Sequence, residues 1–114
     1  MIRETERLIQ AQLEAYNRRD LNAFIECYAD TIELIYLSTN VIFCKGIAEL
    51  HEIYKKIFKE HPLLYCRLTQ RMICGDYVID EEQISGLVDK KLVHTIATYQ
   101  IKHGLIQKVW FIKN

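Results

Sequence analysis

The sequence has little proline and little glycine, with one proline and four glycines among 114 residues. It also lacks an excess of charge, because 15 lysines and arginines balance 15 aspartates and glutamates. The scattered basic residues leave no positive patch for phosphate backbones, so we expect no nucleic-acid partner. No apolar run is long enough to cross a bilayer, and the charged opening segment has no signal-peptide core. We expect one domain over residues 1–114, located in the cytoplasm, with no membrane partner.

Cysteine and histidine are present, but not in motifs that bind metals or transfer electrons. Cys27, Cys44, Cys66 and Cys74 form no CxxC pair and lie within apolar patterns, which favours reduced core thiols over disulfides. A reactive Cys74 beside the Gly75–Asp76 turn is the alternative. The four histidines show neither HxH nor HExxH spacing, so we expect no metal site and no cofactor.

The opening segment predicts two helices joined by a sharp turn. Ile9, Leu13 and Tyr16 recur at helical spacing, and Asp20 stands where its carboxylate can cap a second, short helix. That second helix carries the apolar residues Ala23, Phe24, Cys27 and Tyr28.

The rest of the chain predicts a hairpin, a third helix and a sheet. The hairpin strands cover 31–37 and 41–44, and an amphipathic helix follows Gly46 and ends at His61–Pro62. Turns then divide the chain into strands near 65–74, 77–86, 91–102 and 105–112, which form an antiparallel meander. The class is α+β, with three helices covering one face of a strongly curved, antiparallel-rich sheet. Such a sheet forms a cone whose open mouth can hold a ligand.

This order of elements resembles the SnoaL-like branch of the nuclear transport factor 2-like superfamily. The resemblance rests on the joint from Tyr16-Asn17 to Asp20-Leu21, on Tyr28-Ala29-Asp30, on Gly46, and on the segment from Gly75 to Gly86. It implies a cystatin-like α+β roll with a conical pocket. Its relatives include ketosteroid isomerases, polyketide cyclases, dehydratases and modules without catalysis, so the fold alone does not name an activity.

Ketosteroid isomerase uses an aspartate base that faces a tyrosine and a protonated aspartate. The resemblance places the tyrosine near Gln12, the base near Tyr36 and the protonated aspartate near Ala97. Gln12 and Tyr36 can donate hydrogen bonds, but neither readily takes a proton from carbon. The usual residues of that reaction are therefore missing.

Two carboxyl groups replace them as candidates. Strand alternation places Asp80 and Glu82 on one face, which the resemblance points into the cone. Repulsion and burial there would raise at least one pKa toward the range of a general base. The alternative is that both acids are solvated or paired with Arg67 or Arg71 on the neighbouring strand.

Aromatic residues supply the candidate ligand-binding surface. We expect Tyr99 and Trp110 to line the cavity and, with Tyr16, Tyr36 and Gln12, to hold a flat apolar ligand. The alternative is ordinary core filling. Lys108 shares the face of Trp110 and could hold a carboxylate or enolate, although a surface lysine is the ordinary outcome.

The outer sheet face is expected to carry apolar groups that no helix covers. The set is Leu92, His94, Ile96 and Thr98 with Val109 and Phe111. A homodimer packed sheet to sheet would cover them, as is common in this superfamily.

Two functions follow. The first is an isomerase, cyclase or dehydratase type of enzyme, which acts on a small apolar carbonyl compound by proton abstraction or hydration. Asp80 or Glu82 would be its base, and Tyr36 or Tyr99 would donate to the oxyanion. The second is a binding or dimerisation module that uses the same pocket without turnover.

Overall fold

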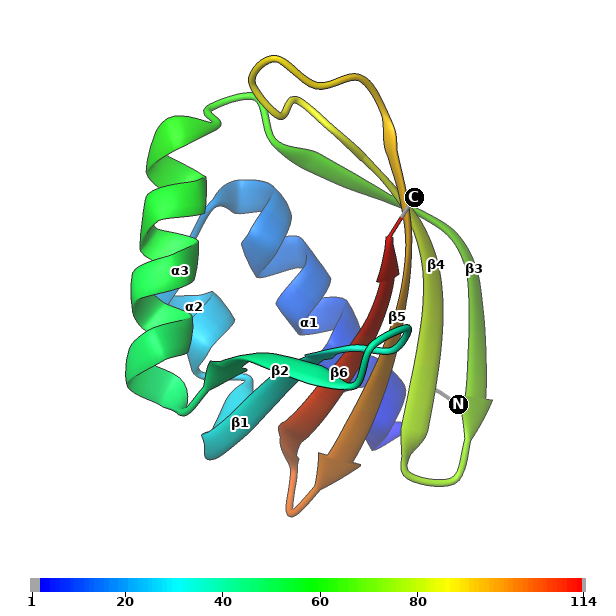
Figure 1. The fold of residues 1–114 in the computed structure, drawn as a ribbon. Coiled ribbons are helices and arrows are strands. Elements are labelled where there is room, and N and C mark those ends of the chain that lie inside the picture. Colours follow the sequence, from blue (N-terminus) through cyan, green and yellow to red (C-terminus); the bar gives the residue numbers. More distant parts are fainter. Residues whose placement is uncertain (1–2, 114) are drawn as a thin grey trace.

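The computed structural model describes residues 3–113, and Figure 1 shows three helices beside a curved sheet. The helices are α1 (Glu4–Arg18), α2 (Leu21–Ile25) and α3 (Ile47–Glu60). The strands are β1 (Tyr28–Tyr36), β2 (Val41–Lys45), β3 (Tyr65–Cys74), β4 (Tyr77–Ser85), β5 (Val93–Lys102) and β6 (Leu105–Lys113). The predicted α+β class with a curved sheet and three helices is confirmed.

The six strands form one mixed sheet in the order β2-β1-β6-β5-β4-β3. Strands β3 to β6 form the predicted antiparallel meander. Strand β1 joins it by pairing parallel with β6 and antiparallel with β2. The helices lie on the concave side of this sheet (Figure 1), so the inner sheet face and the helices enclose the core.

The predicted joint between the first two helices is present. Helix α1 ends at Arg19 in the left-handed conformation, with φ 55°. Asp20 then caps α2, since its Oδ1 accepts the backbone N–H of Ala23 at 3.1 Å.

The end of α1 is also fixed to the start of β3. The Asn17 amide donates to the Cys66 carbonyl at 3.0 Å and accepts the Cys66 N–H at 2.8 Å. Arg19 adds a bond of 2.8 Å to the Leu64 carbonyl. These contacts hold one turn of α1, including Tyr16, over the inner face of the sheet.

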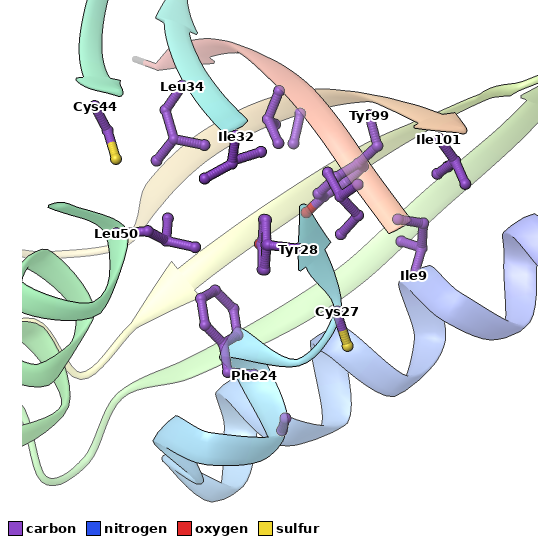
Figure 2. Close-up of a cluster of buried hydrophobic side chains, with 14 of the residues drawn as sticks. Ile9, Phe24, Cys27, Tyr28, Ile32, Leu34, Cys44, Leu50, Tyr99 and Ile101 are labelled. Atoms are coloured by element: carbon purple, nitrogen blue, oxygen red, sulfur yellow. The ribbon is translucent and has the colours of Figure 1, made fainter. Parts of the chain in front are cut away.

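An aromatic cluster fills the space between the helices and β1. The ring of Phe24 lies 4.5 Å from that of Tyr54 and 5.0 Å from that of Tyr28, measured between centroids. Figure 2 shows Phe24 and Tyr28 within the larger core, whose labelled aliphatic members include Ile9, Ile32, Leu34 and Leu50. This core closes one end of the cone.

The face predicted for the last strand is wrong. Trp110 lies opposite Thr98 and therefore on the outer face, whereas Val109 and Phe111 lie opposite Tyr99 and Ala97 and point inward. Apolar residues of β6 point to both faces of the sheet, so the sequence pattern does not decide which set faces inward. A shift of one residue exchanges the two faces. Cys74 is also exposed rather than in the core, while the other three cysteines are buried and all four are free.

Element boundaries differ slightly from those predicted. Strand β1 begins at Tyr28 rather than at residue 31, because its first residues lie against the core and pair with β6. Strand β5 begins at Val93 rather than at residue 91, after a loop over residues 86–92. That loop is held by a bond of 3.0 Å from the Val88 N–H to His61 Nδ1.

Gly86 begins this loop and has no room for a side chain. Its φ is +80°, and a Cβ there would overlap the Leu63 backbone. We expect Gly86→Ala to lower the free energy of unfolding by about 1–3 kcal/mol more than Gly75→Ala, since overlap adds to the cost of a positive φ. Gly75 is the matched control because it also has positive φ but open space around it. Equal losses in urea denaturation would contradict this account.

Candidate active site

A cavity of about 160 Å³ lies between the helices and the inner sheet face. A cavity of about this size accommodates a benzene ring in other proteins. Its wall is mostly apolar and includes residues from α1, β1, α3 and strands β3 to β6: Gln12, Leu13, Tyr16, Tyr28, Tyr54, Ile57, Cys66, Glu82, Ile84, Leu87, Lys90, Val93, Thr95, Tyr99, Phe111 and Lys113.

Glu82 is the carboxyl group in this wall, and it is only 5% exposed. Burial raises its pKa from the ordinary value to about 7, and the neighbouring Asp80 charge contributes to the rise. The Cys66 thiol and the positive charges of Arg71 and Lys113 oppose the rise. Near neutral pH, Glu82 can therefore both release and accept a proton.

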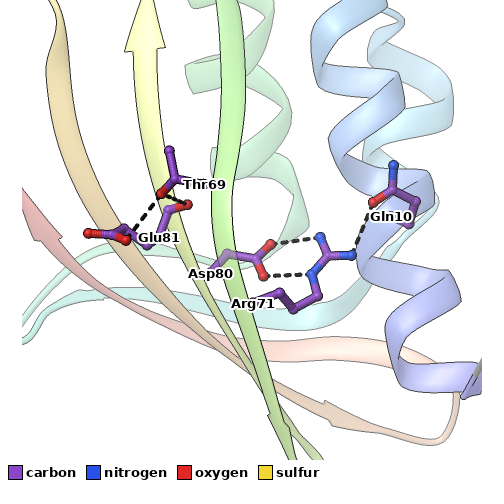
Figure 3. Close-up of polar contacts among 5 residues, drawn as sticks. All are labelled: Gln10, Thr69, Arg71, Asp80 and Glu81. Atoms are coloured by element: carbon purple, nitrogen blue, oxygen red, sulfur yellow. Dashed lines mark hydrogen bonds and ion pairs between the residues drawn. The ribbon is translucent and has the colours of Figure 1, made fainter.

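Asp80 is also buried, but it has a cation against it. Both of its oxygens accept from Arg71, at 2.7 Å from Nε and 2.9 Å from a terminal nitrogen. Arg71 also donates to Gln10 of α1 at 3.0 Å (Figure 3). Asp80 is absent from the cavity wall. Of the two arginines considered as its partner, the structure pairs it with Arg71. Arg67 instead donates to Gln83.

Four tyrosines surround Glu82 in the wall. Tyr16 and Tyr99 were expected there, whereas Tyr28 and Tyr54 were not singled out from the sequence. Burial raises the pKa of all four hydroxyls, and the Glu82 charge adds to that rise in each case. The hydroxyls therefore keep their protons and can serve as hydrogen-bond donors.

Two further polar atoms in the wall have no hydrogen-bond partner within residues 3–113. They are Oε1 of Gln12 and Oγ1 of Thr95, whose side chains are 5% and 1% exposed. Leaving a buried polar group unpaired costs about 1–3 kcal/mol. A bound molecule with a matching polar group would recover that cost.

Besides Asp80, three expected site residues lie outside the cavity wall. Tyr36 is 37% exposed and stacks on Phe43, with centroids 4.2 Å apart, because β1 runs past the cavity to the hairpin at the sheet edge. Trp110 packs near Tyr77 on the outer face. Lys108 lies on the same face and is 3.6 Å from Glu33. Phe111 and Lys113, which occupy the other alternation of β6, line the cavity instead.

The family follows from a match over most of the chain. A model of the SnoaL-like domain family matches residues 9–109. The chain belongs to the SnoaL-like domain family. No curated protein matches its sequence.

Solved structures share the fold of this SnoaL-like domain at low sequence identity. An uncharacterised cystatin-fold protein from Novosphingobium aromaticivorans has a TM-score of 0.87 and 17% identity, over 98% of this chain and 99% of that chain. A candidate ketosteroid isomerase from Kribbella flavida has a TM-score of 0.81 and 16% identity, over 97% and 78%. A candidate polyketide cyclase from Sinorhizobium meliloti has a TM-score of 0.80 and 14% identity, over 97% and 100%.

Among residues 3–113, no helix is long and apolar enough to cross a membrane. The same residues contain no group of three or more histidine, cysteine or acidic side chains that could hold a metal ion.

The buried Glu82 carboxyl should make stability depend on pH. The folded domain favours protonated Glu82. Its contribution to the unfolding free energy is therefore fully present below the ordinary glutamate pKa and is lost as pH rises through about 7. Glu82→Gln keeps a neutral side chain at every pH. Between about pH 5 and about pH 8, wild type should lose about 2 kcal/mol of unfolding free energy relative to this variant. Parallel pH profiles in urea denaturation would contradict the prediction.

Proposed function

We propose that this SnoaL-like domain binds a small apolar carbonyl compound in its cavity and transfers a proton on it. The main support for this proposal is the buried Glu82 carboxyl, whose pKa of about 7 matches the range of a general base at neutral pH. Apolar walls around it favour an apolar ligand. The cavity of about 160 Å³ suits a molecule with about one six-membered ring.

The proposed step is an isomerisation that needs no co-reactant. Glu82 as carboxylate takes a proton from the carbon next to the carbonyl, and the electron pair of that C–H bond moves onto the carbonyl oxygen to give an enolate. The hydroxyl of Tyr99 or Tyr16 donates a hydrogen bond to this oxygen. When the substrate has a double bond between its β and γ carbons, this enolate is a dienolate. Its electrons then return to form a C–H bond at the γ carbon, using the proton from Glu82, and the double bond moves to between the α and β carbons. The proton count is unchanged.

The alternative is a binding module in which the same cavity holds a ligand without turnover. The unpartnered Gln12 and Thr95 atoms support a bound ligand under either function, since they need a polar partner whether or not a reaction follows. The free thiols of the domain suit a reducing compartment, and we propose the cytoplasm as its location.

Exchange of carbon-bound protons separates the two functions. In deuterated buffer, wild type should speed exchange next to the carbonyl of single-ring ketones, with a rate that rises with pH through about 7. Glu82→Gln should reduce this rate by about 100-fold or more, because it removes the base. NMR of the ketone measures the exchange.

Glu81→Gln is the matched control for that experiment. Glu81 is adjacent in sequence but faces outward, where it pairs with His94 at 2.8 Å. Its loss should leave exchange unchanged. Exchange that is equal in wild type and Glu82→Gln would reject Glu82 as the base, and binding without any exchange would favour the binding module.

We also propose that the outer sheet face forms a homodimer interface. The expected residues Ile96 and Thr98 lie there, and the corrected phase of β6 adds Trp110 and Ile112 in place of Val109 and Phe111. Met72, opposite Ile79, extends this apolar surface and is 55% exposed. Burial of such a surface against a second copy would remove it from water.

Light scattering at micromolar concentration should give the mass of two chains for wild type. Ile96→Glu should give the mass of one chain, since it places a charge in the middle of the apolar face. Leu63→Glu is the control, because Leu63 is 79% exposed in a loop between α3 and β3 and lies outside the sheet. A monomer mass for wild type would reject the interface.

A further inference from the structure

The polar groups of the cavity are arranged in a row across three neighbouring strands. Glu82 of β4 lies opposite Thr95 of β5, and Thr95 lies opposite Lys113 of β6. All three residues line the cavity. Neighbouring strands are about 5 Å apart, so the row extends about 10 Å from the Glu82 backbone to the Lys113 backbone.

The Lys113 end of the row carries two positive charges. Lys113 and Lys90 both line the cavity, Lys90 from the loop between β4 and β5. The Lys113 ammonium lies 5.3 Å from the centroid of the Phe111 ring and 6.0 Å from that of Phe43. Within the described residues, neither lysine has an acidic side chain at salt-bridge distance.

The charges at this end favour an anion. Burial and the Lys90 charge lower the pKa of Lys113, whereas the Glu82 charge raises it. Glu82 is the one carboxyl in the wall, and it is partly neutral near pH 7. An anion at the Lys113 end would therefore complete the charge balance of the cavity.

The apolar wall between the two ends limits the body of the ligand. The side chains of Ile57, Ile84 and Phe111 belong to this wall, and the cavity volume of about 160 Å³ corresponds to about one ring. A ring with a short chain spans about the length of the row. A flat molecule of several fused rings would not fit within this volume.

We propose that the cavity selects an apolar monocarboxylate of about one ring, with its carboxylate at Lys113 and Lys90 and its reacting carbon beside Glu82. This inference rests on the proposed function, because it names the class of substrate for the same cavity. A competing occupant is an ammonium compound held by Glu82 and the tyrosine rings, since cations bind aromatic faces. The two lysines would repel it.

Three ligands of the same size distinguish these occupants: hydrocinnamate, hydrocinnamamide and phenylpropylammonium. Titration calorimetry at low salt near neutral pH should show wild type binding the carboxylate about tenfold or more tightly than the amide, and the ammonium most weakly. Added salt should reduce the difference, because both lysines are exposed.

Lysine variants locate the source of this preference. Lys113→Gln should bring the carboxylate-to-amide ratio close to one, and Lys90→Gln should lower it less, because Lys113 is itself the end of the row whereas Lys90 lies in the loop after β4. Lys91→Gln is the matched control: it removes the same charge from the adjacent residue, which is outside the cavity wall, and should keep the ratio. Circular dichroism confirms that each variant is folded.

Failure of this inference and failure of the proposed function give different results. Equal binding of carboxylate and amide, tightest binding of the ammonium, or a preference that survives loss of both Lys113 and Lys90 would overturn the carboxylate site. Absence of binding by all three ligands would also overturn it. None of these results decides whether Glu82 acts as a base, because that role is decided by the exchange rate of the Glu82→Gln variant. That variant should keep the carboxylate preference, because the preference comes from the lysines.

Discussion

The chemistry proposed for this domain depends on two buried carboxyl groups, two residues apart on β4, of which only one has a cation against it. Asp80 is held on both oxygens by Arg71, whereas Glu82 faces an apolar cavity. Burial of a carboxylate without a close cation favours its protonated form. The fixed charge of Asp80 adds to this effect. The same strand therefore carries one carboxyl group in a structural role and one whose pKa lies near neutrality.

The fold keeps these two environments apart. Gln10 of α1 reaches Arg71 on the Asp80 side, and Asn17, two turns further along the helix, bonds the Cys66 backbone on the Glu82 side. Helix α1 therefore supports the ion pair at one point and closes the cavity at another. This arrangement leaves Glu82 in the cavity wall, apart from the ion pair of Asp80 and Arg71.

Local patterns predicted most of the fold and about half of the candidate site. The Asp20 cap and the helix joint are readable from local residue patterns. The phase of β4 is not, because apolar and acidic residues occupy both of its alternations, so the resemblance to SnoaL-like proteins supplied the direction of Asp80 and Glu82. Strand β6 is apolar on both alternations, so only pairing with β5 decides that Lys113 rather than Lys108 faces the cavity. Tyr54 was missed for a related reason, since its apolar helical stripe is equally typical of core and of cavity wall.

The pKa of the Glu82 side chain is the most direct test of this account. Carbon-detected NMR of the side-chain carboxyl, assigned by its loss in Glu82→Gln, follows the titration of this one group. The account predicts a midpoint near 7, well above that of an ordinary glutamate. A midpoint at the ordinary glutamate value of about 4.3 would contradict it, because the carboxyl would then be solvated and could not serve as a base tuned to neutral pH.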